Sequence, residues 1–141
     1  MIEVWTDGSV RGNPGIGGIA VVITSNNTII KEFSGIVGHS VTSNEAEYQA
    51  VIKALELLIE LDDGMDCIIY TDSKLVWGQT TQNWKVNFGR LALLRNKVKA
   101  LMKSCPFLVT LIWSSRTNNV ANKLAQTVTK VEKEKGFNGV Q

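Results

Sequence analysis

The stretch Thr42-Ser43-Asn44-Glu45-Ala46-Glu47-Tyr48 marks the point where the chain changes from strand periodicity to helix periodicity. Thr42 followed three residues later by Glu45 fits a capping box, in which each side chain accepts from a backbone N–H near the other. Beyond it, apolar residues recur at helical spacing: Ala46, Ala50, Ala54, Leu57, Leu58 and Leu61. We therefore predict a helix that runs from this box to about residue 60 and ends near 62–64.

Three strands are predicted before this helix, at residues 2–6, 16–24 and 28–36. Each is rich in β-branched and apolar residues. The turns between them are short, at 11–15 and 25–27, and contain the Gly, Pro and Asn residues typical of turns. Short connections of this kind favour an antiparallel meander.

The second half of the chain alternates strands and helices. A strand is predicted at 67–70, a short helix after Asp72, a polar linker at 79–87 and an amphipathic helix at 88–103. A fifth strand follows at 107–113, and a last helix runs from Asn118 or Asn119 to about 135. Strands separated by helices pair in parallel. We therefore predict an α/β fold with a mixed five-stranded sheet flanked by helices, forming one domain over 1–135 with a loose tail at 136–141.

The composition of the 141 residues is that of an ordinary globular protein, with 44% hydrophobic and 20% charged residues. The net charge of +2 conceals an asymmetry: residues 1–70 hold 3 basic and 10 acidic side chains, and residues 71–141 hold 12 basic and 3 acidic ones. A basic half suits a polyanionic partner. Cys67 and Cys105 are expected as reduced thiols. With no signal-peptide pattern and no membrane-length apolar run, we expect a cytoplasmic monomer.

Three acidic residues stand at the junctions of the predicted elements. Asp7 and Asp72 each end an apolar, β-prone run, and Glu47 lies in the first turn of the predicted helix. Singly, these positions also suit turn-forming aspartates and a helix-dipole glutamate. Together, carboxylates at one sheet edge repel each other unless a cation holds them, and such hard oxygen ligands suit Mg²⁺ or Mn²⁺. The set therefore predicts a metal site for phosphoryl chemistry.

The motifs around these acids are Asp7-Gly8-Ser9 with the turn at 11–15, Ser43-Asn44-Glu45-Ala46-Glu47-Tyr48, and Thr71-Asp72-Ser73. In this order, and on these elements, they resemble the motifs of the ribonuclease HI family, over a stretch from Ile2 to about Val128. The resemblance implies a ribonuclease H-like fold and an endoribonuclease that cuts the RNA strand of RNA–DNA hybrids, leaving 5′-phosphomonoesters.

The resemblance also implies how the site would work. Asp7, Glu47 and Asp72 would hold two cations, Mg²⁺ or Mn²⁺, roughly 3.5–4 Å apart. One ion would lower the pKa of an attacking water, and the other would stabilise the leaving 3′ oxygen.

One departure from the family pattern concerns the fourth site residue. Family members usually carry an acid near the start of the last helix, and Asn122 occupies that place here. We expect Asn122 to complete the catalytic and metal-binding set through its carbonyl oxygen, which brings no negative charge. Metal binding should weaken rather than vanish, and activity should fall by at least about 10–100-fold.

A second departure lies in the loop at 114–118, where many relatives have a histidine. Arg116 is the charged residue of this loop, and it is a poor acid or base because it stays protonated. The single histidine, His39, is expected to be a surface loop residue without a catalytic role.

The expected substrate contacts also come from the resemblance. Backbone groups around Gly12 and the side chains of Asn13 and Asn44 would face the minor groove, where the 2′-hydroxyls lie. Thr42 would contact a DNA phosphate. Relatives often carry Gln at the position of Lys74. Lys74 and Arg116 are therefore candidates for contacts with backbone phosphates. Further candidates for the DNA strand are Trp77, Trp84, Lys85, Arg90 and Arg95, although core packing suits the tryptophans equally well.

Two alternatives remain open at this point. Asn122 could have abolished catalysis and left a protein that only binds hybrids. The wider superfamily of polynucleotidyl transferases and junction-cleaving enzymes shares these carboxylates, but its members usually carry additional domains.

Overall fold

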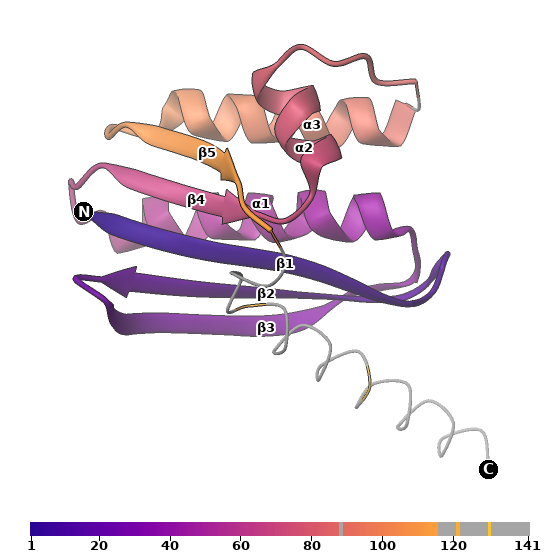
Figure 1. Cartoon of the computed structure of the whole chain (residues 1–141), viewed down its shortest axis with the longest axis horizontal. Helices are drawn as coiled ribbons and strands as arrows, with labels where there is room; N and C mark the ends of the chain where they lie inside the picture. Colours follow the sequence, from indigo (N-terminus) through magenta and orange to yellow (C-terminus); the bar gives the residue numbers. More distant parts are fainter. Residues whose placement is uncertain (88, 116–120, 122–129, 131–141) are drawn as a thin grey trace.

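The computed structural model describes residues 1–87, 89–115, 121 and 130. The elements in this part of the chain are β1 (Ile2–Gly12), β2 (Gly15–Ser25), β3 (Thr28–Val41), α1 (Ser43–Leu61), β4 (Cys67–Thr71), α2 (Lys74–Thr81), α3 (Gly89–Ser104) and β5 (Val109–Trp113). Helix α1 packs across β1 and β2, and α3 packs against α1 on the same side of the sheet (Figure 1).

The five strands form one mixed sheet in the order β3-β2-β1-β4-β5. The first three strands pair antiparallel, whereas β4 pairs parallel to β1 and β5 parallel to β4. This arrangement confirms the predicted fold class. Because β1 is central and its neighbour β4 runs parallel to it, with the pairing ending at Trp5 and Tyr70, the end of β4 lies beside the middle of β1.

The first strand is longer than its apolar run indicated. β1 continues to Gly12, and its pairing with β2 is unbroken from Ile2 to the tight turn at Asn13 and Pro14. Asp7 therefore lies in the middle of β1, opposite Ala20 of β2, and the prediction that it ends a strand is wrong. The backbone pairing of a hairpin continues through polar residues as long as the partner strand is there to accept it.

Helix α1 begins as predicted. The Thr42 side chain accepts from the backbone N–H of Glu45, and the Glu45 carboxylate accepts from the backbone N–H of Thr42, so the capping box is present. The helix ends at Leu61, and Asp62 follows in the left-handed conformation with φ 46°. Glu47 lies just beyond the first turn, whose acidic residue is Glu45.

The core lies between the sheet and the helices. Ile2 and Val4 of β1, together with Ile69 of β4, face Leu55 and Leu58 of α1, and all five side chains are almost fully buried. The Trp77 ring packs against this core, whereas Trp84 stays 41% exposed and meets Trp77 edge-on. The alternative of core packing therefore holds for Trp77.

The predicted linker at 79–87 begins too early. Gln79 belongs to α2 and is buried, because its side-chain carbonyl accepts a hydrogen bond of 2.6 Å from the hydroxyl of fully buried Tyr48. Its amide donates to the carbonyl of Lys85 at 3.3 Å. This pair ties α1 to α2 and to the segment that precedes α3.

We predict that Tyr48→Phe lowers the free energy of unfolding by about 1–3 kcal/mol, because it leaves a buried acceptor on Gln79 without its donor. Urea denaturation would measure the loss. Tyr70→Phe is the matched control, because the Tyr70 hydroxyl donates to Glu3 at a partly exposed site. Equal losses for both variants would contradict the prediction.

Other sequence-based predictions have mixed outcomes. His39 is exposed as expected but lies on β3 rather than in a loop, since that strand continues to Val41. Cys67 and Cys105 are free thiols. The last helix and the tail at 136–141 lie outside the described residues, apart from Ala121 and Lys130. Among the described helices, none is long and apolar enough to cross a membrane.

Candidate active site

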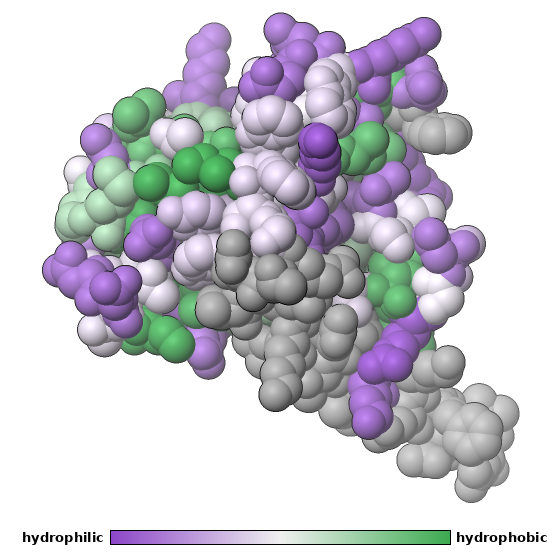
Figure 2. Space-filling view, in the orientation of Figure 1, coloured by the Kyte–Doolittle hydropathy of each residue, from purple (hydrophilic) through white to green (hydrophobic). Residues whose placement is uncertain are grey.

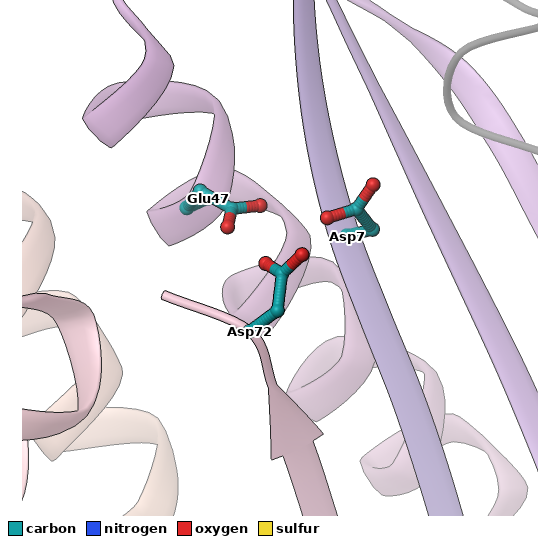
Figure 3. A group of neighbouring side chains, drawn as sticks. All are labelled: Asp7, Glu47 and Asp72. Carbon is teal, nitrogen blue, oxygen red and sulfur yellow. The ribbon is translucent and has the colours of Figure 1, made fainter. Parts of the chain in front are cut away.

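The three predicted carboxylates meet at one point of the fold. Asp7 comes from β1, Glu47 from α1 and Asp72 from the residue that follows β4, and their side chains point toward one another (Figure 3). One oxygen of each carboxylate lies within 4.8 Å of one oxygen of each of the others. Asp7 and Glu47 are buried, and Asp72 is half-buried.

The close approach of β1 and α1 brings Asp7 and Glu47 together. A Cβ atom on Gly8 would lie only 2.5 Å from the carbonyl carbon of Ala46 and 2.6 Å from the backbone nitrogen of Glu47. The backbone N–H of Gly8 donates to the Glu47 carboxylate. Glycine is therefore required at this position so that strand and helix can touch.

Asp72, the third acid, is positioned by contacts at the end of β4, the strand beside β1. The Thr6 hydroxyl donates to the carbonyl of Tyr70 at 2.9 Å and so ties β1 to the end of β4. Directly after Asp72, Ser73 caps α2 by accepting from the backbone N–H of Val76 at 3.1 Å. Asp72 thus lies between two fixed elements.

The carboxylates repel one another in the absence of a cation. The pKa of Glu47 is raised well above its ordinary value of 4.5, first because of burial and then because of the hydrogen bond to Asp72 and the charges of Asp7 and Asp72. The N–H of Gly8 opposes this shift without cancelling it. Burial and the neighbouring carboxylates therefore favour the protonated form of Glu47 more than solvent would, and a positive charge in the cluster would oppose this effect.

The donor set fits a divalent metal ion. Three carboxylates supply hard oxygen ligands, which suit Mg²⁺ or Mn²⁺ better than softer metals. A cation among them would replace mutual repulsion with attraction and would favour the ionised form of Glu47.

Several predicted substrate-binding residues line a neighbouring cleft. Asn13, Thr42 and Asn44 contribute to a cleft of about 660 Å³, together with Ser43, Glu45 and the first residues of α3, Gly89, Arg90 and Leu91. Asn13 accepts from the backbone N–H of Ser43 at 3.1 Å, which joins the β1–β2 turn to the start of α1. Arg90 forms a 3.3 Å ion pair with Glu45 across this cleft.

The remaining predicted site residues are distributed as follows. Gly12 is the last residue of β1, directly before the β1–β2 turn, with φ +86°. Lys74 begins α2, two residues after Asp72, with its ammonium nitrogen 5.6 Å from the centroid of the Trp113 ring. Asn122 and Arg116 lie outside the described residues.

A family model described as Reverse transcriptase-like matches residues 5–128. The chain is 38% identical to the ribonuclease H of Francisella philomiragia, over 77% of this chain and 71% of that protein. The chain belongs to the ribonuclease HI family. It is also 40% identical to the ribonuclease H of Actinobacillus succinogenes, over 62% of this chain but only 55% of that relative.

Solved structures of this family have the same architecture. LC11-RNase H1 in complex with an RNA/DNA hybrid is 31% identical with a TM-score of 0.86, over 94% of this chain and 99% of that one. The N-terminal ribonuclease H domain of Rv2228c from Mycobacterium tuberculosis is 29% identical with a TM-score of 0.86, over 96% and 97% of the two chains.

Some contacts around the site of this ribonuclease HI could not be predicted from its sequence. The Glu45–Arg90 pair joins residues 45 positions apart, and the contacts of Trp113 join β5 to the start of α2. The close approach at Gly8 had a signal, since glycine follows the first acid directly, but only the packed helix shows its purpose.

Proposed function

We propose that this protein is a metal-dependent endoribonuclease that hydrolyses the RNA strand of RNA–DNA hybrids. The observation that carries the proposal is the convergence of Asp7, Glu47 and Asp72 within 4.8 Å, in a chain of the ribonuclease HI family. The hybrid bound to LC11-RNase H1 supports the choice of substrate.

The three carboxylates, with Asn122 as a fourth residue, are proposed to hold two Mg²⁺ or Mn²⁺ ions. When bound, such ions supply an activated water and stabilise the charge on the leaving oxygen. The residues of the chain itself hold the ligands in place: Gly8 donates to Glu47, and Thr6 fixes the end of β4.

The hybrid is proposed to lie across the cleft beside the carboxylates. Asn13, Thr42 and Asn44 would contact it through hydrogen-bonding side chains, and Gly12 through its backbone. Hydrophilic side chains project along the top of the molecule in Figure 2. Lys97, Lys99 and Lys103 of α3 are exposed. A polyanion would be attracted to this side of the molecule.

Cleavage of a labelled RNA–DNA hybrid with Mg²⁺ and then with Mn²⁺ tests the proposal. Duplex DNA and junction DNA serve as alternative substrates, and Asp7→Asn is the inactive reference. We expect the parent to cut only the hybrid, and the reference to cut nothing. Cutting of junction DNA in preference to the hybrid would instead identify a polynucleotidyl transferase relative.

A second candidate function is hybrid binding without catalysis, and the residue that favours it is Asn122. Intact hybrid binding with no cleavage in either metal would support this second function.

We predict that Asn122→Asp tightens metal binding and raises the cleavage rate by about 10-fold or more, because it restores a negatively charged ligand. Titration with Mn²⁺ and initial cleavage rates would measure both effects. Asn118→Asp adds the same charge four positions earlier in the sequence and is the matched control. Equal rates for parent and Asn122→Asp would contradict a role for position 122 at the metal site.

A further inference from the structure

Trp113, the last residue of β5, contacts residues on both sides of Ser73. It lies opposite Thr71 in the parallel pairing of β5 with β4 and is 43% exposed. Its indole N–H donates to the backbone carbonyl of Asp72 at 3.3 Å. The ammonium of Lys74 lies over its ring, 5.6 Å from the centroid.

The first contact bears on the metal site. Asp72 leaves the sheet between β4 and the cap of α2, so its carboxylate direction depends on how its peptide is held. The indole N–H is a donor without an acceptor function, and here it is directed at the carbonyl of that peptide. Loss of this bond would free one side of the peptide that carries a metal ligand.

The second contact bears on the nucleic acid. A lysine ammonium over an exposed aromatic face is attracted to the ring and keeps its remaining donors in solvent. Lys74 is exposed, so its ammonium can reach a phosphate of a strand that enters the site beside Asp72. Aromatic and basic side chains at one place are a common combination for binding a nucleic-acid strand.

We propose that Trp113 is a positioning residue that supports the metal site and the substrate strand at once. Its N–H holds the Asp72 peptide, and its ring holds the Lys74 ammonium for a backbone phosphate of the hybrid. The part that concerns the hybrid rests on the proposed function, whereas the part that concerns Asp72 can be measured with metal alone.

Three variants separate the two contacts. Trp113→Phe keeps an aromatic face for Lys74 but removes the N–H, Lys74→Gln removes the cation alone, and Trp113→Leu removes both contacts. Calorimetric titration with Mn²⁺, without nucleic acid, gives the metal Kd. Anisotropy of a fluorescent RNA–DNA hybrid in EDTA gives the hybrid Kd at several salt concentrations without cleavage.

We expect Trp113→Phe to raise the Mn²⁺ Kd by about three- to tenfold and to leave the salt dependence of hybrid binding unchanged. Lys74→Gln should leave the Mn²⁺ Kd within about twofold of the parent. The Lys74 ammonium is not a metal ligand, and solvent screens its exposed charge. Its log Kd–log salt slope should fall by about 0.7–0.9, the change for one phosphate contact. Trp113→Leu should show both effects.

Lys31→Gln is the control for charge, because Lys31 is exposed on β3 at the opposite edge of the sheet from β5. It should change neither quantity. If Trp113→Phe has the same Mn²⁺ Kd as the parent, the proposed role of the indole N–H at Asp72 is wrong. If Lys74→Gln has the same salt slope as the parent, the proposed phosphate contact is wrong. If the parent neither binds hybrid in EDTA nor cuts it with Mg²⁺ or Mn²⁺, the proposed function falls together with the phosphate contact, while the Mn²⁺ titration still decides the role at Asp72. Should Trp113→Leu fail to fold by circular dichroism, the other two variants carry the test.

Discussion

Replacing Glu47 with Gln is expected to abolish hybrid cleavage and, without metal at neutral pH, to stabilise the fold. The loss of activity should be at least about 100-fold, because removing a residue that only supports a ligand already costs about 10–100-fold. The gain in stability follows from the raised pKa of Glu47, because at neutral pH the glutamine removes a buried carboxyl group whose ionised form is disfavoured in the fold. Glutamine keeps the shape of the buried side chain and removes the charge that Asp7 and Asp72 repel.

The pH dependence follows from the direction of the shift. The pKa of Glu47 is higher in the folded protein than its ordinary value of 4.5, so the folded state binds this proton more tightly than the unfolded state. The stability contributed by that proton is complete below about pH 4.5 and is lost as the pH rises through the folded pKa. Parent and Glu47→Gln should therefore be equally stable near pH 4 and diverge toward neutral pH.

Urea denaturation at several pH values, in EDTA and then in excess Mn²⁺, would measure these differences. Added Mn²⁺ should reverse the order at neutral pH, because the metal binds the folded parent and stabilises it by mass action. Glu56→Gln, an exposed position on the same helix, is the matched control and should show no such divergence. A parent that is as stable as Glu47→Gln at neutral pH in EDTA would contradict the electrostatic account.

Gly8→Ala is expected to destabilise the protein by about 2–4 kcal/mol and to impair the metal site as well. The added Cβ would lie 2.5 Å from the backbone of Ala46, and backbone cannot rotate away as a flexible side chain can. Strand β1 and helix α1 would have to separate. Because Asp7 lies on one of these elements and Glu47 on the other, the separation would also widen the carboxylate cluster.

The measurement is thermal or urea unfolding together with Mn²⁺ affinity. Gly89→Ala provides the comparison, because a Cβ at the start of α3 would meet nothing within 4 Å. That substitution should be neutral or stabilise by up to about 1 kcal/mol, since alanine has less freedom to lose on folding. A Gly8→Ala protein with parental stability and Mn²⁺ affinity would show that the contact of β1 with α1 can relax without consequence.

The sequence alone determined the elements that local chemistry specifies. The capping box at Thr42 and Glu45 placed the start of α1 correctly, because it depends on residues three positions apart. The apolar runs identified all five strands, and the change from short turns to helical connections gave the mixed sheet. The three carboxylates were found because each lies in a short motif whose residues are contiguous.

Only the tertiary structure decided features that depend on partners distant in the chain. β1 continues through Asp7 to Gly12 because β2 pairs with it there, which no local pattern in β1 indicates. Gln79 is buried in α2 rather than exposed in a linker because the Tyr48 hydroxyl, 31 residues away, satisfies its carbonyl. Trp113 ended a predicted strand, and only the packing of β5 beside the start of α2 gave its indole the contacts with Asp72 and Lys74. Local hydrogen bonds and periodicity can be read along a chain, whereas pairing, burial and the spacing of charges arise when separate segments pack together.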